Sequence, residues 1–277
     1  MGDWSAGYVS ELEYSFGYYA ELNPLNMEAA FINSGYVYPA IENACELGFG
    51  QGLSINMHAA ASTINWYGND FIPAQASFAQ QLARSSGANA RLFDDSFEEF
   101  ARRQDLPDFD FIGLHGVWSW ISAKNRQVLV DFFKKKLKVG GVLYLSYNTL
   151  PGWANFAPVR HLMTQHADVL GAQGDGVASR INESLKFADE LLQLNPLFAA
   201  ANPGVADKLN SMKTQSRSYL AHEYFNKDWE PMHFSAVAEL LGSAKLSYAC
   251  SAAIVEDMNQ LCLTEEQTAF LEQIPDR

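Results

Sequence analysis

Short apolar runs alternate with amphipathic stretches between residues 36 and 150. Three stretches have helical spacing of their apolar positions: 53–62, 74–87 and 124–141. Five apolar runs lie around them and read as strands: ENACELG (42–48), TINWYGND (63–70), ANARLFDD (88–95), DFDFIGLHG (108–116) and VLYLSYN (142–148). This alternation predicts βαβ units around a mostly parallel sheet.

The pattern changes after LPGW at 150–153. Residues 154–215 are mainly helical in pattern, with apolar residues at Ile181, Leu185, Ala188 and Leu192. We predict that this segment is a helical insertion over the carboxyl edge of the sheet. Strand-like runs return at 217–225 and 245–256 around a predicted helix at 234–244. The expected fold class is therefore α/β, a Rossmann-like sheet of seven mostly parallel strands.

Composition narrows the class of protein. The chain has 277 residues, 48% hydrophobic and 18% charged, which is typical of a globular protein. A run of about 18 apolar residues is missing, as is a signal-like N-terminus, so we predict no membrane span and a cytoplasmic location. The three cysteines, Cys45, Cys250 and Cys262, have neither disulfide nor metal spacing, so no metal is expected. A net charge of -13 argues against binding of nucleic acid.

The sequence CELGFGQGLSI (45–55) places three glycines between the first strand and the first helix. A dinucleotide fingerprint requires its third glycine three places after the second, but position 53 is Leu. NAD is thereby disfavoured, and a Walker loop is excluded because Lys-Ser or Lys-Thr does not follow. The remaining pattern, acid-x-Gly-x-Gly-x-Gly, has the form of the first motif of class I S-adenosylmethionine (SAM) methyltransferases.

Acidic residues end the next two strands. Asp70 follows the second strand, about 20 residues after the loop, where a carboxylate can accept both ribose hydroxyls. Asp94 and Asp95 follow the third strand, where a polar group can meet the adenine amine. Alternatively, Asp70 caps a helix and the other two belong to a surface turn.

Longer strings extend the similarity over nearly the whole chain: GYVSELEYSFGYYAELNP, FDFIGLHGVWSW, GGVLYLSYNTLPGW and YLAHEYFNKDWEP. They resemble a bacterial group of class I SAM-dependent methyltransferases that carry a downstream methyltransferase regulatory domain, some of which methylate lysines of outer-membrane proteins. The resemblance implies SAM as cofactor and a protein lysine, surface glycan or small molecule as acceptor. Because His115-Gly116-Val117-Trp118 replaces an Asn-Pro-Pro-aromatic tetrad, methylation of DNA is not expected.

Two other functions stay open from the sequence. One is a SAM- or nucleoside-binding regulatory module without turnover, since the binding residues are the same. The other is an NAD-linked oxidoreductase, which would need Gly at position 53.

The site residues follow from the strand ends and the resemblance. Predicted cofactor contacts are Glu46, Gly48, Gly50, Gln51, Gly52, Asp70, Phe71, Asp94, Asp95 and His115. Predicted catalytic candidates are His115, His222 and Tyr147, with His115 equally interpretable as packing and His222 as part of a buried structural pair with Glu223. Predicted substrate contacts are Tyr14, Tyr18, Tyr19, Trp118, Asn148 and Glu223.

The expected organisation has five parts. Residues 1–35 form a lid or cap, whose aromatic stretch either closes over the site or simply packs, and 36–153 form the SAM-binding core. Residues 154–215 form the helical substrate cap, 216–256 supply the last strands, and 257–277 lead toward a regulatory domain of which the chain holds only the first part.

Overall fold

The computed structural model describes Leu12, residues 14–171 and residues 176–274. Its centre is a parallel five-stranded sheet in the order β3-β2-β1-β4-β5. The strands are β1 (Asn43–Leu47), β2 (Asn65–Asn69), β3 (Ala90–Phe93), β4 (Phe109–Leu114) and β5 (Leu137–Leu145). The order reverses at β1, which has β2 on one side and β4 on the other, and this switch point is where open α/β sheets bind ligands.

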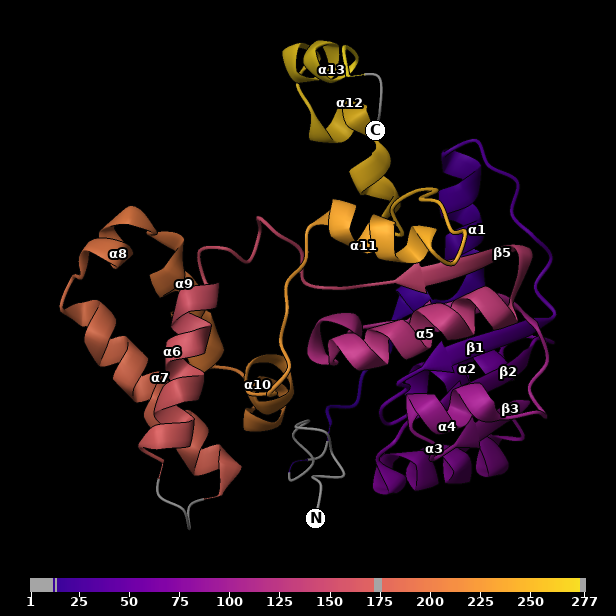
Figure 1. Cartoon of the computed structure of the whole chain (residues 1–277), viewed down its shortest axis with the longest axis horizontal. Coiled ribbons are helices and arrows are strands. Elements are labelled where there is room, and N and C mark those ends of the chain that lie inside the picture. Colours follow the sequence, from indigo (N-terminus) through magenta and orange to yellow (C-terminus); the bar gives the residue numbers. More distant parts are fainter. Residues whose placement is uncertain (1–11, 13, 172–175, 275–277) are drawn as a thin grey trace.

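Helices cover both faces of this sheet (Figure 1). One face packs against α1 (Pro24–Asn33), α2 (Leu53–Ala60) and α3 (Pro73–Ser86). The other face packs against α4 (Phe97–Arg102), α5 (Ala123–Lys136) and α11 (Phe234–Gly242). The α/β class with a parallel, doubly covered sheet is thus confirmed.

A second group of helices lies beside the sheet and has its own apolar core (Figure 1). It contains α6 (Ala157–Val169), α7 (Val177–Gln193), α8 (Leu197–Ala201), α9 (Gly204–Lys213) and α10 (Arg217–Tyr224). Its core includes buried side chains of α6, α7, α9 and α10. Figure 1 shows α10 between this helical group and the sheet.

The prediction of seven strands was wrong. Residues 217–225 form α10 because the Ser216 side chain caps the helix by accepting from the Tyr219 N–H, while Leu220, Ala221 and Tyr224 point into the helical core. In the range 245–256 the structure has irregular chain that enters a 3₁₀ turn, η3 (Ile254–Asp257). The remaining short elements are η1 (Ala20–Leu22), η2 (Trp118–Trp120), α12 (Asn259–Cys262) and α13 (Glu265–Leu271).

Candidate functional site

The glycine loop joins β1 to α2 at the switch point. Gly52 has a φ of 70°, and a Cβ there would lie 2.5 Å from the Cβ of Ala79, so both the backbone conformation and the packing on α3 require glycine. The Gly48 N–H donates to the Asn69 carbonyl at 2.8 Å, which holds the loop against the end of β2. The loop is therefore fixed by its neighbours before any ligand binds.

Asp70 binds this loop directly. Its Oδ2 accepts the Gly50 N–H at 2.8 Å and its Oδ1 accepts the Ile72 N–H at 3.0 Å. Burial raises the pKa of Asp70 to about 7, although the two backbone hydrogen bonds act in the opposite direction. Each carboxylate oxygen still has a second lone pair, so Asp70 can accept two hydroxyl groups of a ligand while it holds the loop.

Glu46, the last residue but one of β1, shares this buried region. Burial, and next the charge of Asp70, raise the pKa of Glu46 to about 8. Its Oε2 is buried and makes no hydrogen bond among the residues that the structure describes. A buried acceptor without a donor is costly, so this atom indicates a place for a donor or cation that a ligand brings.

A pocket opens above these groups. It encloses about 640 Å³ of space between atoms, part of it open to solvent. The predicted residues that line it are Tyr14, Tyr19, Glu46, Gly48, Gly50, Asp70, Phe71 and His115. Other residues that line it were not among the predicted contacts: Leu22, Phe49, Ile72, Gln75, Phe97, Gly116, Val117, Trp120 and Ile121. They were missed from the sequence because most are ordinary apolar residues in the loops after strands.

A wider hollow of about 930 Å³ lies along the edge strand β3. Its charged lining residues are Arg84, Arg91 and Asp105. Because none of the acids at the strand ends lies there, we place the candidate site at the smaller pocket.

His115 occupies the wall of the pocket just after β4. Its Nδ1 lies 2.7 Å from the Tyr144 hydroxyl, and its ring stacks on Tyr19 with 4.2 Å between centroids. Burial lowers the pKa of His115, so the neutral imidazole is the resting form at pH 7. Both interpretations of His115, as a base and as packing, fit a neutral ring in this position.

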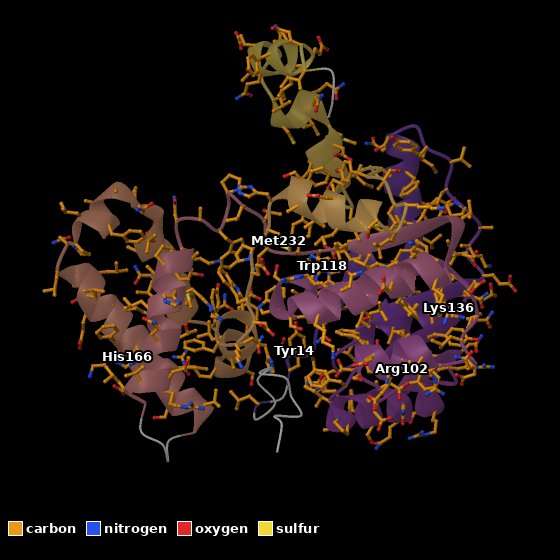
Figure 2. The ribbon with its side chains drawn as sticks, in the orientation of Figure 1. Tyr14, Arg102, Trp118, Lys136, His166 and Met232 are labelled. Atoms are coloured by element: carbon orange, nitrogen blue, oxygen red, sulfur yellow. The ribbon has the colours of Figure 1, made fainter. Side chains whose placement is uncertain are left out.

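The segment from Tyr14 to Tyr19 crosses the mouth of the pocket. The Tyr14 ring is 3.1 Å from where a Cβ of Gly50 would lie, its carbonyl accepts from Gln51 Nε2 at 3.3 Å, and its other side meets the His222 ring at 5.1 Å between centroids. Figure 2 shows Tyr14 between the sheet and the helical group. Tyr19 is anchored by its N–H, which donates to Ser54 Oγ at 2.8 Å.

Tyr18 turns away from the pocket. It lies 3.3 Å from His58 Nε2 and is 46% exposed, so its predicted contact with substrate would require the segment to move.

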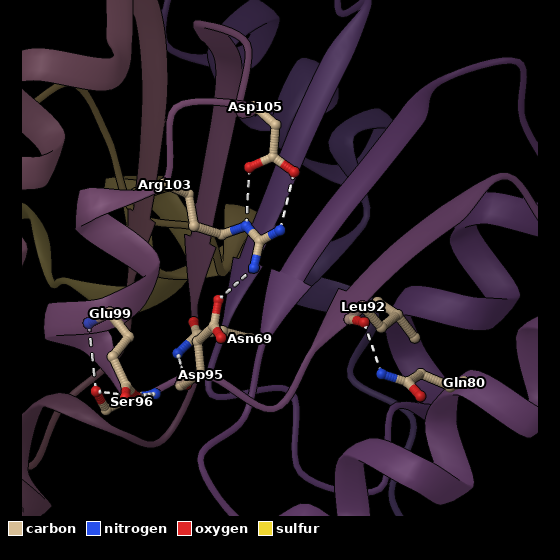
Figure 3. Close-up of polar contacts among 8 residues, drawn as sticks. All are labelled: Asn69, Gln80, Leu92, Asp95, Ser96, Glu99, Arg103 and Asp105. Atoms are coloured by element: carbon tan, nitrogen blue, oxygen red, sulfur yellow. Dashed lines mark hydrogen bonds and ion pairs between the residues drawn. The ribbon is translucent and has the colours of Figure 1, made fainter.

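Asp94 and Asp95 do not line the pocket. Asp94 is exposed, and Asp95 Oδ2 accepts from Arg103 at 3.0 Å, while Arg103 also pairs with Asp105 (Figure 3). The backbone carbonyl of Asp95 accepts from Asn69 Nδ2 at 2.9 Å, which ties this turn to the end of β2. Asp95 thus has a structural partner, and a contact with adenine stays a prediction.

Trp118, which was predicted as a substrate contact or as core, does not line the pocket. Its side chain is completely buried in the core under α5. The reason is the 3₁₀ turn of η2, in which residues two positions apart point in different directions. Trp120 therefore lines the pocket while Trp118 fills the core.

The other catalytic and substrate candidates lie behind the pocket. His222 is buried on α10, and its Nε2 lies 2.9 Å from the Leu12 carbonyl, which favours the interpretation as structural. Tyr147 packs at the edge of the α5 core. Asn148 donates its N–H to Ser119 Oγ at 2.8 Å, and Trp120 Nε1 donates to the carbonyl of Glu223 at 2.9 Å. Glu223 therefore contacts Trp120, which lines the pocket, but does not line the pocket itself.

Neither a metal-binding group of side chains nor a membrane-spanning helix is found in the described part of the chain. It holds no group of three or more His, Cys, Asp or Glu side chains arranged to bind a metal. Nor does any of its helices combine the length and apolar character needed to cross a membrane.

Known proteins resemble this chain in sequence and in fold. Residues 216–277 match the family model of a predicted methyltransferase regulatory domain. This match starts at the cap of α10, earlier than our predicted boundary at 257. The structure is similar to that of PKMT2 from Rickettsia typhi in complex with AdoHcy, with a TM-score of 0.77 and 22% identity, over 95% of this chain and 50% of that one.

Curated relatives are similar over different lengths. An uncharacterized protein of Synechocystis sp. (strain ATCC 27184 / PCC 6803 / Kazusa) is 41% identical over 99% of this chain and 54% of its own length. A second, from Rickettsia prowazekii (strain Madrid E), is 28% identical over 68% of this chain and 75% of its own length. This chain thus spans about half the length of the Synechocystis protein and of PKMT2. The fold of a class I methyltransferase and the resemblance to proteins with this regulatory domain are confirmed.

Proposed function

We propose that this chain binds SAM at the switch point of its sheet and transfers the methyl group to an acceptor that enters beside α10. The observation that carries the proposal is the junction of the glycine loop with two buried carboxyl groups. Asp70 holds the loop through the Gly50 N–H, and Glu46 presents an acceptor atom without a donor. A ligand with a ribose diol and a cationic end would satisfy both.

The charge of the pocket supports SAM over a dinucleotide. Its lining, as far as the chain is described, includes Glu46 and Asp70 but neither Lys nor Arg. The phosphates of NAD would oppose ionisation of these two carboxyl groups, whereas a sulfonium and an ammonium would favour their ionised forms and be attracted to them. Cation binding would also pull the pKa values of both carboxyl groups down, so the ligand and the ionised carboxylates stabilise each other.

When bound, SAM supplies an electrophilic methyl group on a sulfonium. The residues of this chain have the tasks of binding, alignment and exclusion of water. Asp70 would bind the ribose, Glu46 the cationic methionyl end, and Phe71 one face of the adenine. The segment Tyr14–Tyr19 would act as a lid, since its aromatic rings lie across the mouth and attract cations.

For the acceptor we propose a protein lysine, with a surface glycan or small molecule as the alternative. The helices of residues 154–215 would form its cap. The free state of all three cysteines fits a reducing compartment, and we propose a cytoplasmic location.

Isothermal titration of the protein with SAM, S-adenosylhomocysteine and NAD tests the proposal. We expect both sulfur ligands to bind and NAD not to bind; binding of NAD alone would overturn it. The Asp70→Ala variant should bind SAM about tenfold or more weakly, because charge-assisted hydrogen bonds contribute about 1.5–3 kcal/mol. The exposed Asp131→Ala, on α5, serves as the matched control. Binding of SAM without any methyl transfer to cell proteins would favour the regulatory module without turnover.

A further inference from the structure

The hydrogen bond between His115 and Tyr144 belongs to a short chain of polar groups behind the wall of the pocket. The Gly116 N–H donates to Ser146 Oγ at 2.8 Å. A hydrogen bond also joins the side chains of Ser146 and Tyr144, and the Tyr144 hydroxyl lies 2.7 Å from His115 Nδ1. Burial raises the pKa of Tyr144, so its hydroxyl keeps the proton at neutral pH. The chain thus runs from a backbone donor through two hydroxyl groups to one nitrogen of the imidazole.

Counting the hydrogens gives this chain a direction. A backbone N–H can only donate, so Ser146 Oγ accepts from Gly116 and still has its own hydrogen to give. If Ser146 donates to Tyr144, and Tyr144 donates to His115 Nδ1, both hydroxyl hydrogens have an acceptor. In the opposite direction, the Ser146 hydrogen has no acceptor among the described residues. The first direction leaves Nδ1 without a hydrogen and places the imidazole hydrogen on Nε2.

The Nε2 atom of His115 faces the pocket. Tyr144 covers the Nδ1 edge of the ring, and Tyr19 stacks on one of its faces. Within the described chain, Nε2 makes no hydrogen bond, and it is not among the fully buried side-chain atoms that lack a partner. Because His115 lines the pocket, the edge that carries Nε2 is the part of the ring left to a ligand.

Other N–H donors around the glycine loop are already engaged. Trp120 Nε1 donates to a backbone carbonyl, and the described lining of the pocket includes neither Lys nor Arg. An anionic group bound beside the loop therefore finds its side-chain N–H donor at His115. The loop N–H groups that donate to acceptors of the protein itself are those of Gly48, Phe49, Gly50 and Gly52.

His115 also lies next to the residue that we propose for the cationic methionyl end. Glu46 of β1 pairs in register with Gly113 of β4, and His115 comes two residues later. A Cβ on Gly48 would lie 2.7 Å from Cγ2 of Val117, so the glycine loop touches the chain that follows β4. The ammonium and the carboxylate of SAM are attached to the same carbon atom. A ligand whose ammonium binds Glu46 therefore brings its carboxylate toward this part of the wall.

We propose that Tyr144 fixes His115 in the Nε2–H form and that this N–H donates to the α-carboxylate of bound SAM. The inference rests on the proposed function, since it assigns a residue to one group of the same ligand. His115 is then a donor in cofactor binding and not a general base, because Nε2 has no free lone pair. Tyr144 is a positioning residue that acts through His115.

The tautomer is measured in the ligand-free protein. Two-bond ¹H–¹⁵N correlation spectra distinguish a protonated ring nitrogen from an unprotonated one, and the signals of His115 among the six histidines are those that disappear in His115→Gln. At neutral pH we expect the hydrogen on Nε2 in the wild type and a mixture of tautomers in Tyr144→Phe. Tyr67→Phe, which removes the hydroxyl of another buried tyrosine, is the matched control and should leave these signals unchanged. A hydrogen on Nδ1 in the wild type would overturn the proposal.

Titration calorimetry tests the contact with the carboxylate. The ligands are S-adenosylhomocysteine and its decarboxylated analogue, which keeps the amine. A glutamine amide can place an N–H near the position of Nε2, whereas an asparagine amide reaches only the position of Nδ1. His115→Gln should bind S-adenosylhomocysteine within about threefold of the wild type, and His115→Asn about 10- to 100-fold more weakly, the value of a hydrogen bond to a charged group. All three proteins should bind the decarboxylated analogue equally. Equal weakening of both ligands in His115→Asn would show that His115 only packs, and would overturn the contact.

These measurements separate the inference from the proposed function. If the wild type does not bind S-adenosylhomocysteine, the cofactor site fails, while the tautomer is still measured. If the wild type binds it and His115→Gln and His115→Asn bind it equally well, the cofactor site stands and the carboxylate contact is refuted. If either variant does not fold, the wild type still decides, because it should bind the decarboxylated analogue about 10- to 100-fold more weakly than S-adenosylhomocysteine. Equal affinities of the wild type for the two ligands would refute the contact.

Discussion

The buried carboxyl groups at the switch point make the stability of the ligand-free protein depend on pH. Asp70 has an ordinary pKa of 3.8, which burial raises to about 7 in the folded chain. Between these values the folded state holds a proton that the unfolded state has lost, so the free energy of unfolding falls as pH rises. Below pH 3.8 the carboxyl group is neutral in both the folded and the unfolded state. Above pH 7 the folded state carries the full free-energy cost of burying the ionised carboxylate.

The magnitude follows from the difference in pKa. One pKa unit corresponds to about 1.4 kcal/mol, so the whole rise corresponds to about 4 kcal/mol. About 2 to 3 kcal/mol of this falls between pH 5 and pH 8. Glu46, with a pKa of about 8, acts in the same direction, and part of its rise comes from the charge of Asp70. Asp70→Asn should therefore remove the contribution of Asp70 to the pH dependence of stability and part of the contribution of Glu46.

Asparagine stays neutral at every pH, although its Nδ2 cannot accept one of the two backbone N–H groups that Asp70 binds. We expect the Asp70→Asn variant to lose about 2 kcal/mol less stability than the wild type between pH 5 and pH 8. Urea unfolding, followed by tryptophan fluorescence at both pH values without ligand, measures this. The exposed Asp94→Asn corrects for the general repulsion of a chain with a net charge of -13. If the wild type and Asp70→Asn lose the same stability between the two pH values, the buried charge at Asp70 is refuted.

A further prediction concerns the glycine loop. Gly52→Ala would place a Cβ 2.5 Å from the Cβ of Ala79 at a φ of 70°. The variant should therefore lower the free energy of unfolding, measured with urea, by about 1–3 kcal/mol. Gly176→Ala, with open space around its Cβ, should not lower it, and equal effects of the two variants would contradict the packing argument.

The central sheet was predictable because its signals are local. Five apolar runs bounded by turn residues predicted β1 to β5, and the acid at the end of β2 was correctly placed beside the glycine loop. Parallel strands carry their carboxyl ends to one edge, so the position of Asp70 followed from the order of elements alone. The order of elements did not predict which side chains pack above this edge, because apolar residues such as Ile72, Phe97 and Trp120 have no chemical signal of their own.

The prediction of strands after residue 216 was wrong, and the reason is again local. In RSYLAHEYF, alternation and helical spacing both place Leu220 and Tyr224 on one face, so the apolar pattern does not decide between a strand and a helix. The Ser216 cap and the apolar core of α7 and α9 decide for the helix. Residues 245–256 are rich in small side chains, which pack equally well without a strand, and the Asp257 carboxylate accepts the Ser251 N–H at 2.7 Å there.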